Sequence, residues 1–173
     1  MNETLQSLKK RRSIRKYKPD QIRDDELNAI LEAGMYAPSA ANQQSATMVV
    51  VQQPALRAKL TKMNAAVIGK EMDPYYGAPT IILVFGDKTK AAPIEDASLV
   101  LGNLGIAAHA LGIGSCWIHR EKQMFETEEG KALMKEWGLS EDCFGVGSII
   151  LGYPDCEEPK APPRKEGYVI LAK

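Results

Sequence analysis

Residues Thr80-Ile81-Ile82-Leu83-Val84-Phe85 form the stretch that decides the fold of this 173-residue chain. The run has the length of a strand, contains β-branched residues and shows no alternation of apolar and polar positions. A strand with one face in water alternates in this way, so this strand is predicted to be covered on both faces.

Working outward from this strand, apolar periodicity and turn residues predict helices that alternate with strands. The N-terminal half is predicted to contain helices at 3–12, at 24–34 and from Pro54 onward, with a strand at 47–51. The C-terminal half is predicted to contain helices at 94–111 and 121–137, strands at 115–118 and 146–151, a proline-rich arm at 154–163 and a short strand at 168–171. Gly34 and Gly138 are expected to end the helices before them. The alternation indicates one α+β or α/β layered domain over residues 1–173.

The predicted helix at 94–111 is apolar nearly all round, since Ile106 and Ala107 fill the side opposite its other apolar positions. A helix of this kind is buried. Covering it on every side within 173 residues is difficult unless a second copy contributes, so we predict a homodimer. His109 lies inside this helix and is interpreted as a core residue rather than a metal ligand.

Charge and composition exclude several classes of protein. The 22 basic and 22 acidic residues balance, so no global field points to a partner. The N-terminus lacks the pattern of a signal peptide, and the longest apolar-rich stretch, 97–118, contains Asn103, His109 and four glycines, so we expect no membrane span. The three cysteines lack the spacing of a zinc site or a redox dithiol. A reducing, cytoplasmic setting without a metal site is expected.

The sequence Arg11-Arg12-Ser13-Ile14-Arg15 is the strongest local signal, within a stretch where seven of ten residues from Lys9 to Lys18 are basic. If the first helix continues through it, Arg12 and Arg15 share a face. Guanidinium groups and a hydroxyl suit the oxygens of a phosphate. A charge run taken alone is more often a solvated face. Nucleic acid is disfavoured, because the cluster is one short stretch in a neutral protein.

Two loops could contact a ligand. The uncharged stretch 37–44 ends in Asn42-Gln43-Gln44, whose amides suit the donor and acceptor edge of a heteroaromatic ring, although such loops are more often turns. The stretch 112–120 has glycines that permit close backbone approach, but position 117 is Trp where a dinucleotide fingerprint needs glycine. Cys116 in this stretch is interpreted as buried packing, because no His and acid partner can be assigned to it.

These pieces occur in a recognisable order. Arg-Arg-Ser-x-Arg at 11–15 is followed by Ala-Pro-Ser-x-x-Asn-x-Gln at 37–44, Gly-Ala-Pro at 77–79, Gly-x-Gly-Ser-Cys-Trp at 112–117, Gly-Tyr-Pro at 152–154 and Pro-Arg-Lys at 163–165. Over essentially its whole length the chain resembles the nitroreductase family of FMN-dependent oxidoreductases. The resemblance implies an α+β fold with a central, mostly antiparallel sheet flanked by helices. It also implies an intertwined homodimer with FMN in a cleft at each end of the interface.

The resemblance assigns expected roles position by position. Arg11, Arg12 and Ser13 would hold the flavin phosphate and ribityl chain, and Arg164 and Lys165 would close on the phosphate. Arg15 would lie near the pyrimidine edge, where Asn42 and Gln44 would bond the ring. Pro38 and Ser39 would reach the flavin of the other subunit. The backbone amides of Ile118, His119 and Arg120 would face N5, the atom that accepts hydride.

The implied activity is reduction of small acceptors, such as nitroaromatics or quinones, by NADH or NADPH in a ping-pong mechanism through flavin N5. No side chain is required as a general base. The expected partners are a second copy and a small-molecule electron acceptor, with no nucleic acid and no membrane. The alternatives are a different reaction on the same fold, such as dehalogenation or flavin cleavage, a non-catalytic flavin carrier, and a binding protein that uses the basic patch.

Overall fold

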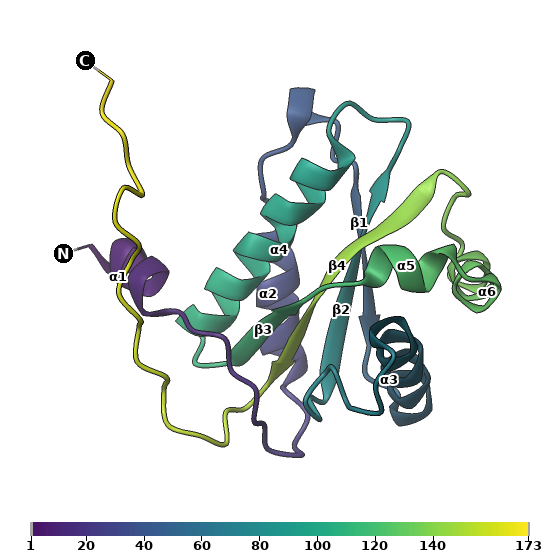
Figure 1. Ribbon diagram of the computed structural model, residues 1–173, viewed down its shortest axis with the longest axis horizontal. Helices are drawn as coiled ribbons and strands as arrows, with labels where there is room; N and C mark the ends of the chain where they lie inside the picture. The colour runs from purple at the N-terminus through teal and green to yellow at the C-terminus, as the bar shows by residue number, and fades with distance from the viewer. Residues whose placement is uncertain (1, 173) are drawn as a thin grey trace.

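A computed structural model describes residues 2–172, and Figure 1 shows the arrangement of its elements. The helices are α1 (Glu3–Lys10), α2 (Asp24–Met35), α3 (Pro54–Ile68), α4 (Pro93–Ala110), α5 (Glu121–Glu126) and α6 (Glu128–Glu136), with a short 3-10 turn η1 (Ala40–Asn42). The strands are β1 (Ala46–Val51), β2 (Thr80–Asp87), β3 (Gly114–Ile118) and β4 (Cys143–Gly152). Within the described residues, no helix is long and apolar enough to cross a membrane.

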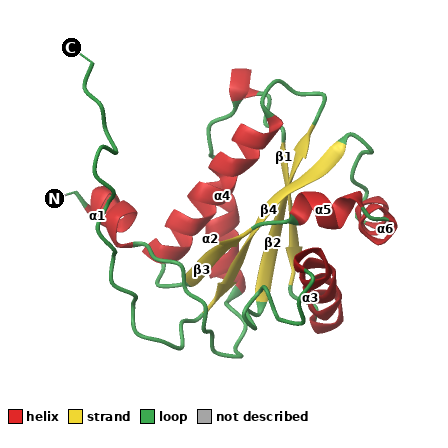
Figure 2. Cartoon of the chain, in the orientation of Figure 1, coloured by secondary structure: helices red, strands yellow, loops and turns green. Residues whose placement is uncertain are grey.

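The four strands form one antiparallel sheet in the order β1-β2-β4-β3. Helices α2 and α4 lie against one face, and α3 and α5 lie on the other (Figures 1 and 2). Ile81, Leu83 and Phe85 of β2 enter the core beneath α3 and α5, whereas Ile82 and Val84 enter the core beneath α2 and α4. The prediction of a strand covered on both faces, within a mostly antiparallel α+β domain, is confirmed.

Helix α1 is shorter than predicted, because it ends at Lys10 rather than at residue 12. It is only 8 residues long and buries none of its side chains, so little favours its extension. The chain then runs along the edge of β3, where the N–H of Ile14 donates to the carbonyl of Ser115 at 2.9 Å. The prediction that Arg12 and Arg15 share a helical face is therefore wrong.

Two further helix predictions were wrong in detail. Gly34 does not end α2 but lies inside it, where an added Cβ would come within 2.8 Å of Leu104 Cδ2 on α4. The glycine thus permits the close approach of two helices. The predicted helix 121–137 is divided at Thr127, whose side chain accepts a hydrogen bond from the N–H of Gly130 and caps a new helix. Apolar spacing continues across the break, so periodicity does not reveal it.

The predicted strand at 168–171 is not formed, since none of the described residues pairs with this segment. A strand needs a neighbour for its backbone groups, and the arm instead runs past α1 toward the C-terminus (Figure 1). Its four apolar side chains are 68–88% exposed.

Helix α4 is buried on one side only in this chain, because Ile94 and Leu99 are about half exposed, and His109 is only partly buried.

Candidate functional site

A groove of about 500 Å³ lies beside α4, between that helix and the start of the chain. Arg11 and Ser13 line one wall, while Trp117 of β3 and the glycines of α4 contribute others. Because residues 11–15 are extended, neighbouring side chains point to different sides. Arg12 and Ile14 accordingly line a separate hollow of about 250 Å³. The structure therefore brings Arg11 and Ser13 together and separates Arg12 from them.

The groove is open because α4 carries glycines where it faces the groove. A Cβ added to Gly102 would meet no atom within 4 Å, and one added to Gly105 would approach Ile149 Cδ1 to 3.3 Å. Glycine at both positions lets a flat group approach the helix backbone closely. A guanidinium group, a hydroxyl group and a bare helix face together suit a ligand that is both anionic and planar.

The turn after β3 offers hydrogen-bond donors beside this groove. Trp117 is 54% exposed, and its ring centroid lies 5.3 Å from that of His119. Among residues 2–172, the backbone N–H groups of His119 and Arg120 donate to no protein acceptor. Ile118 precedes them as the last residue of β3 and is buried. Arg120 is in the left-handed region with φ +91°, which is strained for a residue with a side chain.

Arg15 lies in the same extended segment but makes a different contact. Its guanidinium carbon lies 5.9 Å from the ring centroid of Tyr76, and its side chain is exposed. Tyr76 belongs to a tight turn in which the Asp73 carboxylate accepts hydrogen bonds from the backbone N–H groups of Tyr75 and Gly77. Arg15 is therefore held by an aromatic face rather than by an acidic partner.

The loop 37–44 is a compact unit tied to the first turn of α4. Buried Asp96 accepts hydrogen bonds from the N–H of Ala40 at 2.8 Å and the hydroxyl of Ser45 at 2.7 Å. Within the loop, Ser39 Oγ accepts the N–H of Gln44 at 3.0 Å, and Gln44 Nε2 donates to Asn42 Oδ1 at 3.1 Å. Asn42 and Gln44 both have positive φ. Such strained residues persist only where their surroundings hold them.

Helix α4 separates this loop from the groove within one chain. Asp96 and Val100 line a hollow on the loop side of α4, together with Pro38 and Ser39. Ser98, Gly102 and Gly105 line the groove instead. By helical spacing, these two sets lie on opposite sides of α4. Pro38, Ser39 and Gln44 therefore lie across α4 from the groove of their own chain.

Arg164 and Lys165 do not line the groove in this chain. Arg164 donates to the carbonyl of Pro162 at 2.7 Å, and the ammonium group of Lys165 lies 5.4 Å from the ring centroid of Tyr168. Both belong to the exposed arm that follows β4. These contacts are local, so no contact among residues 2–172 directs either side chain toward Arg11.

A buried polar cluster that was not predicted from the sequence lies beneath the turn 119–121. Asn64, Tyr75, Glu121 and Ser148 are completely buried. Burial raises the pKa of Glu121 to about 7. Glu121 Oε1 accepts a hydrogen bond from the hydroxyl of Ser148, while its Oε2 has no hydrogen-bond partner among the residues that the structure describes. Polar residues at core-facing positions of α3 and α5 are the signal that could have identified it, since such groups are costly to bury.

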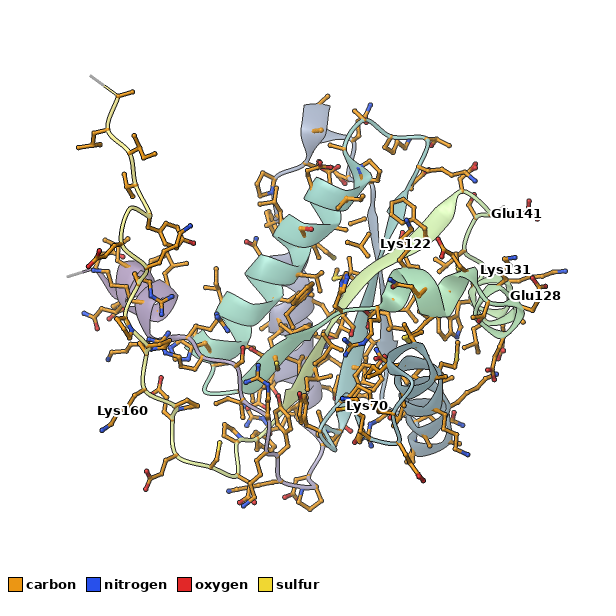
Figure 3. All side chains as sticks on the ribbon, in the orientation of Figure 1. Lys70, Lys122, Glu128, Lys131, Glu141 and Lys160 are labelled. Carbon is orange, nitrogen blue, oxygen red and sulfur yellow. The ribbon has the colours of Figure 1, made fainter. Side chains whose placement is uncertain are left out.

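A larger cavity of about 810 Å³ lies elsewhere, between α5, α6 and the start of β4. Figure 3 shows Lys122, Lys131, Glu128 and Glu141 around that end of the molecule. None of the residues predicted for the site lines this cavity. Its lysines and glutamates include two ion pairs of their own, Lys122 with Glu126 and Lys131 with Glu128. The smaller groove beside α4 is therefore the better candidate site.

Comparison with known proteins identifies a matching family, a relative in sequence and solved structures with the same fold. The model of the nitroreductase family matches residues 8–153. An Archaeoglobus fulgidus protein with the provisional name NADH dehydrogenase/NAD(P)H nitroreductase is 36% identical, over 91% of this chain and 89% of its own. The crystal structure of a nitroreductase with bound FMN from Bacteroides fragilis superposes with a TM-score of 0.91, at 29% identity, over 100% of both chains. A nitroreductase with bound FMN from Desulfitobacterium hafniense gives a TM-score of 0.88 at 27% identity, over 99% of this chain and 100% of its own.

Proposed function

Because this chain belongs to the nitroreductase family, we propose that it is an FMN-dependent oxidoreductase that takes electrons from NADH or NADPH and passes them to a small acceptor. The observation that carries the proposal is the groove beside α4, with Arg11 and Ser13 on its wall and glycines on its floor. A similar chain from Bacteroides fragilis binds FMN, and its fold matches this one along the whole length.

The residues present fit the chemistry of FMN. Arg11 and Ser13 would hold the phosphate, because a guanidinium group and a hydroxyl both donate to its oxygens. The free backbone N–H groups of His119 and Arg120 would face N5. FMN would supply the atom that accepts hydride from the nicotinamide and later returns electrons to an acceptor. The chain's own part is to bind and orient both substrates in turn, so the kinetics should be ping-pong without a general base.

A second copy of the chain would complete each site. Pro38, Ser39 and Gln44 lie across α4 from Arg11, and Gln44 donates a hydrogen bond to Asn42, so all four would serve the flavin of the partner subunit as one unit. Exposed apolar residues on the open side of α4 and on the arm 168–171 support a homodimer, since such surface is normally buried against another molecule. The arm also carries Arg164 and Lys165, which would reach a phosphate only after it packs on a second chain.

The purified protein tests the proposal directly. It should bind FMN in a 1:1 ratio per chain and turn yellow, and anaerobic NADH or NADPH should bleach it. Addition of a quinone, a nitroaromatic compound or an enone should then restore the colour. Bleaching without recovery for any acceptor would indicate an enzyme of another reaction. A yellow protein that neither nucleotide bleaches would be a flavin carrier, and a protein that binds no flavin would contradict the proposal.

A further inference from the structure

Asn64 of α3 makes two hydrogen bonds to the turn that follows β3. Its Nδ2 donates to the carbonyl of His119 at 3.1 Å, and its Oδ1 accepts the Nε–H of Arg120 at 3.0 Å. One partner is an acceptor and the other a donor, so together they fix the orientation of the amide group. Asn64 is completely buried and joins two consecutive residues of the turn to the core.

The turn requires such support, because Arg120 has φ +91° and ψ 4°. A residue with a side chain enters this region only at a cost, and it stays there only when its surroundings over-determine it. Both neighbours of Arg120 are anchored as well. The carbonyl of His119 bonds Asn64, and the side chain of Glu121 accepts the hydroxyl of Ser148 on β4. The peptide groups between these anchors have little freedom to rotate.

The consequence is a fixed direction for one free donor, the backbone N–H of Arg120. The backbone N–H groups of His119 and Arg120 have no acceptor among residues 2–172, and the turn follows directly from Trp117 and Ile118 of β3, the strand that borders the groove. Rotation of the peptide between residues 119 and 120 moves the His119 carbonyl and the Arg120 N–H together, because they belong to the same planar unit. A bond to that carbonyl therefore sets the direction of the N–H.

We propose that Asn64 is a positioning residue that holds the peptide between His119 and Arg120 so that its N–H points at the flavin N5 position. This proposal rests on the proposed function. Oxidised N5 accepts a hydrogen bond, whereas reduced N5 carries a hydrogen, so an N–H donor directed at N5 favours the oxidised form. Asn64 thus sets the relative affinity of the site for oxidised and reduced FMN without touching either.

The experiment measures dissociation constants of both flavin forms for wild type, Asn64→Leu, Asn64→Asp and Tyr75→Phe. Loss of one neutral hydrogen bond weakens binding by about three- to tenfold. Asn64→Leu should raise the dissociation constant of oxidised FMN by that factor and change that of reduced FMN by less than about twofold. A tenfold change in their ratio raises the two-electron potential by about 30 mV. Asn64→Asp keeps the acceptor for Arg120 but loses the donor to His119, so it should show the same shift in the ratio of the two dissociation constants. This variant serves as the test if Asn64→Leu does not fold.

Tyr75→Phe is the matched control. It removes a buried hydroxyl that accepts a hydrogen bond from Asn64 at 3.3 Å, and it leaves both hydrogen bonds between Asn64 and the turn intact. Both of its dissociation constants should stay within about twofold of wild type. Equal changes in Asn64→Asp and Tyr75→Phe, or an unchanged ratio of the two constants in Asn64→Asp, would overturn the positioning role. If wild type binds no FMN, the proposed function fails as well.

A glycine at position 120 gives a second, independent test. Glycine adopts positive φ without strain, so Arg120→Gly should make the support from Asn64 less necessary. In the Arg120→Gly background, Asn64→Leu should change the ratio of the two dissociation constants by less than about twofold, compared with about three- to tenfold in wild type. An effect of Asn64→Leu that is as large in both backgrounds would show that Asn64 does not act through the conformation of residue 120.

Discussion

Glu121 accepts a hydrogen bond from Ser148 at 2.5 Å, and both side chains are completely buried. Burial raises the pKa of Glu121 from 4.5 to about 7. Between these two pH values the folded protein holds a proton on Glu121 that the unfolded chain releases. The stability contributed by the protonated group is fully present below pH 4.5 and is lost as pH rises through 7. A shift of this size corresponds to about 3 kcal/mol.

Glu121→Gln should therefore flatten the pH dependence of stability between about 4.5 and 7, because glutamine stays neutral in both states. Urea unfolding at a series of pH values measures this, with the exposed Glu136→Gln of α6 as the control. Identical slopes for Glu121→Gln and wild type across that range would refute the role of Glu121.

Arg11 and Arg12 are predicted to differ in their effect on FMN binding. Arg11 lines the groove beside Ser13, whereas Arg12 lines a separate hollow. Arg11→Ala should weaken FMN binding by about 1.5–3 kcal/mol, the value of one charge-assisted hydrogen bond, and Arg12→Ala by much less. Fluorescence titration of FMN into each apo variant measures the affinity. A larger loss in Arg12→Ala than in Arg11→Ala would mean that the phosphate lies on the other side of the segment.

Asp96 is predicted to stabilise the loop 37–44. Asp96→Ala leaves the N–H of Ala40 and the hydroxyl of Ser45 without their shared partner, which should lower the free energy of unfolding by about 3 kcal/mol. The neighbouring Glu95 is exposed, so Glu95→Ala is the matched control and should change stability by less than about 0.5 kcal/mol. Denaturant unfolding gives both values, and a similar loss in the two variants would contradict this role.

Two glycines of the α2–α4 region should respond differently to alanine. At Gly34 an added Cβ would lie 2.8 Å from Leu104, so Gly34→Ala should cost about 1–3 kcal/mol of stability. At Gly102 it would meet nothing within 4 Å, so Gly102→Ala should leave the apo protein as stable or up to about 1 kcal/mol more stable. Because Gly102 lines the groove, its variant should still bind FMN less tightly. Thermal unfolding and FMN titration separate the two effects.

Subunit mixing tests whether each site contains residues of two chains. Arg11→Ala and Ser39→Arg should each impair FMN binding in the proposed homodimer. In a heterodimer of the two variants, one cleft contains both substitutions and the other cleft contains neither. About one functional FMN site per dimer should therefore return. A purified heterodimer that recovers no FMN binding would show that the site is built within a single chain.

Local sequence determined much of this protein. The apolar run 80–85 required cover on both faces of the sheet. The helix starting at Pro54 begins where predicted, and the strand predicted at 47–51 begins one residue earlier, because the signals of both elements are local. The order of short motifs, from Arg11 to Lys165, identified the family before any contact was known. Such features depend on residue type and spacing, which are visible in one chain without its partners.

Tertiary structure alone decided which of these residues meet. Pairing with Ser115 turns the segment after α1 into an extended one, and this places Arg11 and Arg12 on different sides. Helix α4 puts the loop 37–44 across from the groove, and the segment 168–171 pairs with no strand among residues 2–172. Asn64 and Glu121 acquire their importance only when α3, α5 and β4 enclose them. Each outcome depends on contacts between residues distant in sequence, and no local pattern encodes them.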